Sequence, residues 1–329
     1  MKEIKISEAK TPRSPRGSSG SDIEPLPAAG LALAQFDGVC SMIKDNLFLG
    51  SETIARDVAA LRRANVTHIL NCAGTICPNY HPKVFQYKTL FLSDGKMEDI
   101  TCLFYDVLEW MEEAYKDPNT KIFVHCQQGV SRSSSFLILY LMWKEQRRFQ
   151  EVHEMVKSIR KTSNPNAGFM CQLLNWWKYH TTGIVDPILY QVRPHGPGSP
   201  DTIVLKEISP KPATRPSAAS FLDKRGSFIL ATSSALYLWR GRDCTPFLFE
   251  WGLKYCRRIK HFENLESLPV VEVVQDSEPD SFWVALDTWY PPPDPSSPPS
   301  RAVSNLEEHS QTYALLKITA EGRKESLPS

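Results

Sequence analysis

The sequence lacks the features that direct a chain to a membrane or to nucleic acid. No stretch approaches the roughly 18–20 apolar residues that a membrane span requires. The N-terminal MKEIKISEAK is charged and has no apolar core, so we expect no secretory signal. The formal net charge is only +1, so the chain as a whole does not attract polyanions. Any charge-driven recognition must therefore be local.

Metal-binding patterns are missing as well. The eight cysteines include no CxxC pair, so zinc-ribbon spacing is absent. We find no convincing set of acidic ligands, and we predict no metal and no cofactor. The cysteine usage fits free thiols in a reducing compartment, the cytoplasm alone or the cytoplasm and the nucleus.

Composition divides the chain into two ordered blocks and three segments of low order. Ser, Pro, Gly and charge dominate residues 1–36, for which we expect a disordered tail. The ordered blocks are expected over 37–182 and 221–290. Between them, 183–220 is Pro-rich and predicts a linker, and 291–329 is expected to be a second disordered tail.

The first block alternates strands with helices. Apolar and β-branched runs predict strands at 46–51, 67–74, 85–95 and 120–126. Helical spacing of apolar residues predicts helices at 52–66, 100–117, 131–147, 149–162 and 168–180. This alternation indicates an α/β fold with a mostly parallel central sheet flanked by helices.

The second block is a smaller α/β unit. Two strands joined by a Ser-rich turn are predicted over 226–243, followed by a helix at 246–262 and a strand at 268–278. The segment 281–290 closes the unit.

The stretch VHCQQGVSRSSSF, from Val124 to Phe136, carries the chemistry of the first block. A strand, a loop and a helix in this order point backbone N–H groups at an anion, with the helix dipole behind them. Gly129 permits a turn that a side chain would obstruct. Arg132 can grip two phosphate oxygens with its planar fork. In that field the Cys126 thiol is expected to ionise readily.

A thiolate beside an anion-binding loop predicts attack by sulfur on a phosphate ester. The loop residues expected to hold the phosphate are Gln127, Gln128, Gly129, Val130, Ser131 and Arg132. His125 is expected to orient the loop, and Ser133 to donate a hydrogen bond to the thiolate. A carboxylic acid on another loop should protonate the leaving oxygen and then activate water.

These residues resemble a known superfamily. His-Cys-x5-Arg-Ser, here HCQQGVSRS, is similar to the signature of the cysteine-based protein tyrosine phosphatases. LILYLMW, NPNAGFMCQL and THILNCAG resemble segments of the dual-specificity branch, and the likeness covers about residues 39–180. The resemblance implies that Asp94, in Leu92-Ser93-Asp94, is the general acid. Asp99 is the alternative, although the family pattern favours it as a helix cap.

The loop interior carries no lysine, in contrast to phosphoinositide phosphatases of the superfamily, and this favours a phosphoprotein substrate. The short block resembles the shallow, dual-specificity type, which implies hydrolysis of phosphotyrosine and of phosphoserine or phosphothreonine.

The second block resembles a gelsolin-like repeat at Phe228, Leu230, Tyr237, Trp239 and Gly241. The two blocks in this order resemble plant MAP-kinase phosphatases, which implies a phosphorylated MAP kinase as the protein partner.

Four alternatives stay open. The chain could be a phosphoprotein-binding or cytoskeletal adaptor with little activity. The basic stretch 253–262 could bind calmodulin, or simply be a solvated helix face. Cys72 or Cys77 could form a reversible disulfide with Cys126. Basic residues of the N-terminal tail could dock an acidic groove on a MAP kinase, and Thr11-Pro12 and Ser14-Pro15 could be phosphorylated in return.

Overall fold

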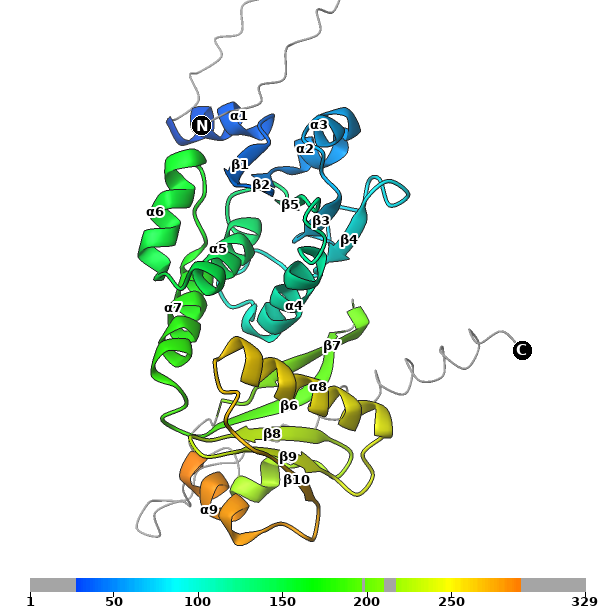
Figure 1. Ribbon diagram of the computed structural model, residues 1–329, viewed down its shortest axis with the longest axis vertical. Helices are drawn as coiled ribbons and strands as arrows, with labels where there is room; N and C mark the ends of the chain where they lie inside the picture. Colours follow the sequence, from blue (N-terminus) through cyan, green and yellow to red (C-terminus); the bar gives the residue numbers. More distant parts are fainter. Residues whose placement is uncertain (1–27, 197–198, 210–216, 291–329) are drawn as a thin grey trace, which may run out of the picture. The chain divides into compact units, whose positions relative to one another are not determined.

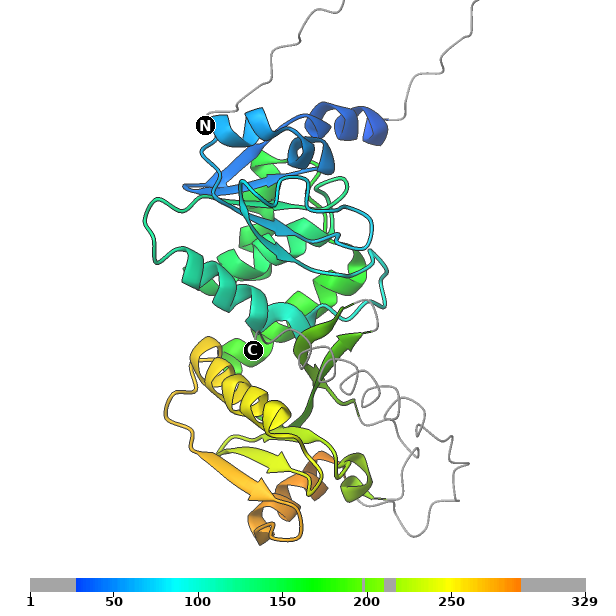
Figure 2. The same ribbon diagram turned by 90° about the vertical axis from the view of Figure 1, so that its right-hand side faces the viewer.

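The computed structural model describes residues 28–196, 199–209 and 217–290 (Figures 1 and 2). The chain divides into two compact units. The first contains Met1–Glu98 with Trp110–Leu174, and the second contains Asp99–Glu109 with Asn175–Ser329. The expectations for residues 1–27, including Thr11-Pro12 and Ser14-Pro15, and for the tail 291–329 lie outside the described residues.

The first unit is built on a five-stranded sheet with the order β1-β2-β5-β3-β4. Its strands are β1 (Ser41–Lys44), β2 (Leu47–Gly50), β3 (His68–Asn71), β4 (Gln86–Thr89) and β5 (Ile122–His125). Only the β1–β2 pair is antiparallel, and the other pairs are parallel. The prediction of a mostly parallel α/β sheet is therefore confirmed. All four residues of β5 are buried, which suits a strand covered on both faces.

Helices cover both faces of this sheet (Figure 1). The helices described up to residue 182 are α1 (Ala28–Asp37), α2 (Glu52–Arg56), α3 (Val58–Arg63), α4 (Phe104–Ala114) after a 3₁₀ turn (Thr101–Leu103), α5 (Arg132–Glu145), α6 (Phe149–Ile159) and α7 (Ala167–Thr182). The 3₁₀ turn, the first part of α4 and the end of α7 are assigned to the second unit. Phe48, Ile69 and Phe123 form one core cluster with the residues of α2 and α3. Leu49, Leu70 and Val124 alternate with them along the strands and are fully buried on the opposite face.

Three local predictions differ from the structure. The single helix expected over 52–66 is interrupted at Asp57, which has ψ 89° and caps α3 by accepting a hydrogen bond from the Ala60 N–H. The strand expected over 85–95 ends at Thr89. Helix α1 occupies part of the predicted 1–36 tail, because AAGLALAQF combines strong helix formers.

The second unit is a mixed five-stranded sheet with the order β10-β9-β8-β6-β7. Its strands are β6 (Ile188–Gly196), β7 (Ser199–Glu207), β8 (Ser227–Ala231), β9 (Leu236–Arg240) and β10 (Val270–Val274), and its helices are α8 (Pro246–Phe262) and α9 (Asp280–Trp289), with a 3₁₀ turn at Ala218–Phe221. The resembled positions Phe228, Leu230, Tyr237 and Trp239 lie in one core cluster with Phe282 of α9. Their periodicity of two explains this shared face.

The segment predicted as a Pro-rich linker, 183–220, contains β6 and β7. These strands form an antiparallel hairpin, and β6 also pairs with β8. Of the prolines that favoured a linker, Pro197, Pro210, Pro212 and Pro216 lie outside the described residues. Pro194 and Pro200 lie near the hairpin end, where the register shifts between Pro194 and Gly196. A missing N–H is tolerated at such an irregular position, so proline frequency misled the prediction.

No described helix combines the length and the apolar character needed to cross a bilayer. In the described part of the chain, no group of three or more His, Cys, Asp or Glu side chains could hold a metal ion.

Candidate active site

The Cys126–Ser131 loop connects the end of β5 to the start of α5. Cys126 is only 2% exposed, and Arg132, the first residue of α5, is 5% exposed. Ser131 occupies the N-cap position of α5 without making a side-chain cap bond. The first N–H groups of a helix have no partner within the helix, so this end can receive an anion.

The carbonyl groups of the loop are turned outward. Six consecutive carbonyls, from Cys126 to Ser131, accept hydrogen bonds from His125 Nδ1 (3.3 Å), the Glu52 N–H (2.9 Å), Arg160 Nη2 (3.1 Å), Arg160 Nε (3.0 Å), the Asn164 N–H (2.9 Å) and the Ser135 N–H (2.9 Å). In a planar trans peptide the N–H points opposite to the C=O. The N–H groups of the loop therefore face the concave side, where a phosphate would sit.

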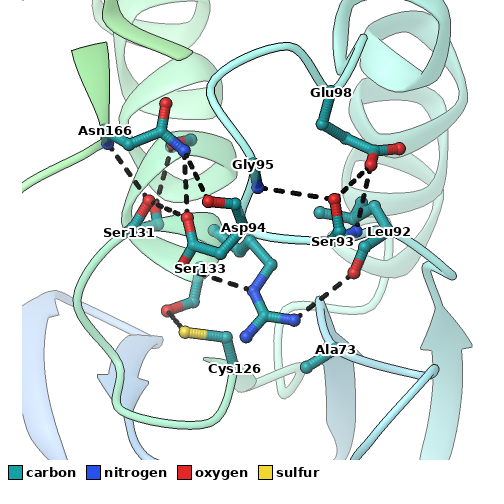
Figure 3. Close-up of polar contacts among 12 residues, drawn as sticks. Ala73, Leu92, Ser93, Asp94, Gly95, Glu98, Cys126, Ser131, Ser133 and Asn166 are labelled. Atoms are coloured by element: carbon teal, nitrogen blue, oxygen red, sulfur yellow. Dashed lines mark hydrogen bonds and ion pairs between the residues drawn. The ribbon is translucent and has the colours of Figure 1, made fainter. Parts of the chain in front are cut away.

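The Cys126 sulfur lies at the bottom of this concave side. It accepts a hydrogen bond from the Ser133 hydroxyl (3.2 Å), which Figure 3 shows. It also accepts one from the Gly129 N–H (3.3 Å). Both donors stabilise a thiolate. Gly129 has φ +68°, and a Cβ there would lie 2.4 Å from the Gly50 carbonyl oxygen. Only glycine fits this turn of the loop.

Asp94 is the carboxylate beside the loop (Figure 3). Its Oδ1 accepts hydrogen bonds from the Ser131 hydroxyl (2.5 Å) and from Asn166 Nδ2 (3.0 Å), and its Oδ2 lies 3.6 Å from Arg132 Nε. Arg132 Nη1 also donates to the Leu92 carbonyl (3.3 Å). The Asp94 side chain is 39% exposed, so it can meet both a substrate and water.

Asp99 has a different position. Its Oδ1 accepts hydrogen bonds from the Thr101 N–H (3.0 Å) and the Thr101 hydroxyl (2.6 Å), at the start of the 3₁₀ turn that leads into α4. This geometry fits the helix-capping alternative rather than an acid at the loop.

Comparisons with known proteins agree with this geometry. Residues 47–179 match the model of the dual specificity phosphatase catalytic domain, and residues 208–283 match the gelsolin repeat. The chain is 34% identical over 138 residues to dual specificity protein phosphatase 1B of Arabidopsis thaliana, covering 42% of this chain and 81% of the relative. The chain belongs to the dual-specificity phosphatase family.

A second relative covers more of this dual-specificity phosphatase. Protein-tyrosine-phosphatase MKP1 of Arabidopsis thaliana is 38% identical over 272 residues, which is 80% of this chain but only 34% of the relative. The chain thus spans about a third of that relative's length. Among solved structures, the human tyrosine phosphatase-like serine/threonine/tyrosine-interacting protein is 29% identical, with a TM-score of 0.40 over 44% of this chain and 98% of its own.

Two residues of the phosphatase site were missed from the sequence. Asn166 precedes α7, where its Oδ1 accepts from the Phe169 N–H (3.0 Å) while its Nδ2 donates to Asp94. An Asn before a helical pattern is a capping signal, which could have drawn attention to it. Arg160 is fully buried and donates to two loop carbonyls. Nothing in its local sequence distinguishes it from a solvated helix-end arginine.

His125 is fully buried under the loop and stacks on Phe123 with ring centroids 5.6 Å apart. Burial lowers the pKa of His125 to about 4, although its hydrogen bond to the Cys126 carbonyl opposes this. The ring is therefore neutral near pH 7, which leaves Nδ1–H free to donate to that carbonyl.

Cys72 and Cys77 are free, buried thiols. Burial raises the pKa of Cys77 to about 12 and that of Cys72 well above its ordinary value. A reversible disulfide with Cys126 stays a prediction.

The basic stretch 253–262 forms the end of α8, with Tyr255, Ile259 and Phe262 buried. The apolar side chains that a calmodulin-like partner would grip are thus part of the core of the second unit, and the helix-face alternative fits this burial better.

Proposed function

We propose that this chain hydrolyses phosphotyrosine and phosphoserine or phosphothreonine in proteins through a cysteinyl-phosphate intermediate. The observation that carries the proposal is the setting of the Cys126 sulfur. It receives the Gly129 N–H and the Ser133 hydroxyl, below a loop whose carbonyls are all engaged elsewhere. Asp94 is the carboxylate that contacts the loop through Ser131 and Arg132.

In the first half of the reaction the Cys126 thiolate attacks phosphorus. The S–P bond forms while the bond between phosphorus and the ester oxygen breaks. Asp94, protonated, gives its proton to the leaving oxygen of the side chain. Arg132 and the inward N–H groups hold the three equatorial oxygens, where negative charge accumulates.

In the second half a water molecule attacks the phosphorus of the intermediate. Asp94, now a carboxylate, accepts the proton of this water, and the S–P bond breaks to release inorganic phosphate. The electron pair returns to the Cys126 sulfur, which the Ser133 hydroxyl stabilises as a thiolate through its 3.2 Å contact. The cycle thus consumes one water molecule and returns Asp94 to its protonated form and Cys126 to its thiolate form.

MAP kinases are the protein substrates that we infer. The support is the likeness of residues 39–180 and of the second block to plant MAP-kinase phosphatases, together with 38% identity to MKP1 of Arabidopsis thaliana. The uncharged interior of the loop, Gln127, Gln128 and Val130, fits a single phosphate on a protein rather than a polyphosphorylated headgroup.

Turnover of a small aryl phosphate tests the reaction class. We expect the reduced chain to hydrolyse p-nitrophenyl phosphate and Cys126→Ser to abolish hydrolysis, because a hydroxyl is not ionised at neutral pH. Replacing the exposed Arg62 by Met serves as the control and should leave the rate unchanged. A reduced wild-type chain without any turnover would favour the phosphoprotein-binding adaptor instead.

A panel of doubly phosphorylated MAP kinases tests the substrate. Mass spectrometry would report which phosphate leaves and at what rate. Loss of both the Thr and the Tyr phosphate from at least one kinase is expected, whereas rates no higher than on an unrelated phosphoprotein would remove the MAP-kinase assignment and leave the phosphatase intact.

A further inference from the structure

Arg160 connects the Cys126–Ser131 loop, here called the phosphate loop, to the segment between the end of α1 and the start of β1. It follows α6, is 0% exposed, and donates to the carbonyls of Gln128 (Nη2, 3.1 Å) and Gly129 (Nε, 3.0 Å). Its Nη1 donates to the carbonyls of Phe36 (3.1 Å) and Val39 (3.2 Å) and to the Ser41 hydroxyl (3.3 Å). One guanidinium thus bridges two segments that are far apart in sequence.

The hydrogen bonds from Arg160 to the Gln128 and Gly129 carbonyls fix the direction of two peptide groups of the loop. The peptide that carries the Gln128 carbonyl also carries the Gly129 N–H, and these two groups point in opposite directions. While Arg160 holds the carbonyl outward, the Gly129 N–H points at the Cys126 sulfur, 3.3 Å away. By the same geometry, the bond to the Gly129 carbonyl turns the Val130 N–H toward the phosphate side.

The partners of Arg160 are neutral oxygens, so its charge is not cancelled by a direct hydrogen bond to a carboxylate. Burial lowers the pKa of Arg160 to about 10, and interactions with Cys126, Cys40 and Asp37 partly oppose this, so the side chain remains a cation at pH 7. A buried cation behind the loop favours negative charge on the concave side in front of it. The cost of burying this charge is offset by the hydrogen bonds that it makes.

We propose that Arg160 is a positioning residue for phosphate binding, which aims the Gly129 and Val130 N–H groups at the oxyanion without touching it. The segment Phe36–Ser41 holds the other edge of the guanidinium. This segment precedes residue 47, where the match to the catalytic domain begins. The proposal rests on the phosphatase site described above and adds a residue that acts from behind the loop.

The test measures binding of tungstate, a tetrahedral dianion shaped like phosphate, to the full chain by isothermal titration calorimetry. Arg160→Met is expected to raise the dissociation constant of tungstate by ~10- to 100-fold, because the Gly129 and Val130 N–H groups would no longer point at the anion. Arg160→Lys keeps the charge but cannot span both carbonyls with one planar fork, so an intermediate rise is expected. Ser41→Ala removes one bond on the far edge and should change the constant less than twofold.

A matched control separates positioning from general stability. Arg258 is also buried (3% exposed) but lies in α8 of the second unit. Arg258→Met should lower the melting temperature and leave tungstate binding unchanged. If Arg160→Met does not fold, as judged by circular dichroism, Arg160→Lys decides the question. A folded Arg160 variant that binds tungstate within twofold of the wild type would overturn the proposal.

The experiment does not depend on turnover. Tungstate binding that depends on Arg160 in a chain without hydrolytic activity would refute the proposed reaction and retain the positioning role. Normal hydrolysis together with tungstate binding that does not depend on Arg160 would refute the positioning role and retain the proposed reaction.

Discussion

At the scale of single residues, the proposed reaction depends on how Asp94, the proposed general acid, is held. Asp94 receives the Ser131 hydroxyl, Asn166 Nδ2 and the Arg132 guanidinium, which fix its two oxygens beside the loop. An acid held in this way matters most when the leaving group is basic. An alkoxide from serine or threonine needs a proton far more than the phenolate of tyrosine, whose pKa is near 10.

Asn166→Ser should therefore lower kcat on phosphothreonine peptides by ~10-fold or more and on phosphotyrosine peptides by less. Serine remains a good N-cap for α7, so the helix is preserved while the amide donor to Asp94 is lost. Steady-state kinetics of the wild type and the variant on both peptides gives the loss of kcat on each substrate. An equal loss on both substrates would contradict the role of Asn166 in holding the acid.

The buried His125 predicts a pH dependence of stability. Its pKa is about 4 in the folded chain against an ordinary value of 6.5, so the unfolded state binds a proton in this interval and the folded state does not. The free energy of unfolding should fall by roughly 3 kcal/mol as the pH drops from 6.5 to 4. Urea unfolding of the wild type and of His125→Gln at several pH values checks this, and the variant should show a flatter profile.

The contacts of Cys126 with Gly129 and Ser133 could be predicted because these residues are neighbours in sequence. Cys126, Arg132 and Ser133 lie within one strand–loop–helix unit, so their spacing already fixes their geometry. Asp94 came only from a resemblance, since no local pattern relates it to the loop. Asn166 and Arg160 were missed because their contacts arise where α6 ends and α7 begins, and sequence spacing does not encode that packing.

At the scale of elements, the start of α7 packs against the loop that carries Asp94, the proposed general acid. Gly168 packs so closely on this loop that a Cβ would lie 1.8 Å from the Lys96 carbonyl oxygen. Lys96 is two residues beyond Asp94, so a shift of its carbonyl carries the acid with it. Gly168, the glycine of NPNAGF, is thus required because its backbone lies too close to the Lys96 carbonyl for a side chain to fit.

Gly168→Ala should lower kcat by ~10-fold or more, because the acid is displaced, and should destabilise the first unit by ~1–3 kcal/mol, as overpacking does. Gly196→Ala is the matched control, since no atom of the described residues lies within 4 Å of the Cβ that it adds. Kinetics and thermal unfolding measure the two effects, and an alanine at 168 with unchanged kcat would show that the acid loop adapts.

The elements also show where periodicity fails as a predictor. The β5 strand and α5 were apparent because each is long, apolar and clearly bounded. The hairpin of β6 and β7 was not, because its prolines and glycines resemble a linker, although ILYQV and TIVLK are rich in the apolar and β-branched residues that favour strands. The pairing of β6 with β8 places this segment in the sheet, and the paired residues lie 35 to 43 positions apart in the sequence. A local pattern does not contain such a distant partner.

At the scale of the whole molecule, the two compact units do not follow the chain in simple order. The segment Asp99–Glu109 belongs to the second unit, together with everything from Asn175 onward. Within this unit Arg258 is 3% exposed, pairs with Asp106 at 3.3 Å and also contacts Glu109. The second unit therefore depends on residues that precede the catalytic loop in sequence.

Arg258→Met should destabilise the second unit by ~3 kcal/mol, because it removes the ion pair between Arg258 and the buried Asp106 carboxylate. The matched double change, Arg258→Met with Asp106→Leu, removes the charge along with its partner and should recover part of the loss. Differential scanning calorimetry follows both. If the Arg258→Met variant is as stable as the wild type, the favourable energy of this ion pair only offsets the cost of burying its two charges.

The outward carbonyls of the phosphate loop have a consequence for protein engineering. Their donors come from Glu52, His125, Ser135, Arg160 and Asn164, and Arg160 is itself held by Phe36 to Ser41. A graft that transfers only HCQQGVSRS onto another strand–loop–helix scaffold would carry the nucleophile and leave most of these donors behind. Such a transplant needs the surrounding frame as much as the signature, and a design that copies the frame first has the better starting point for activity.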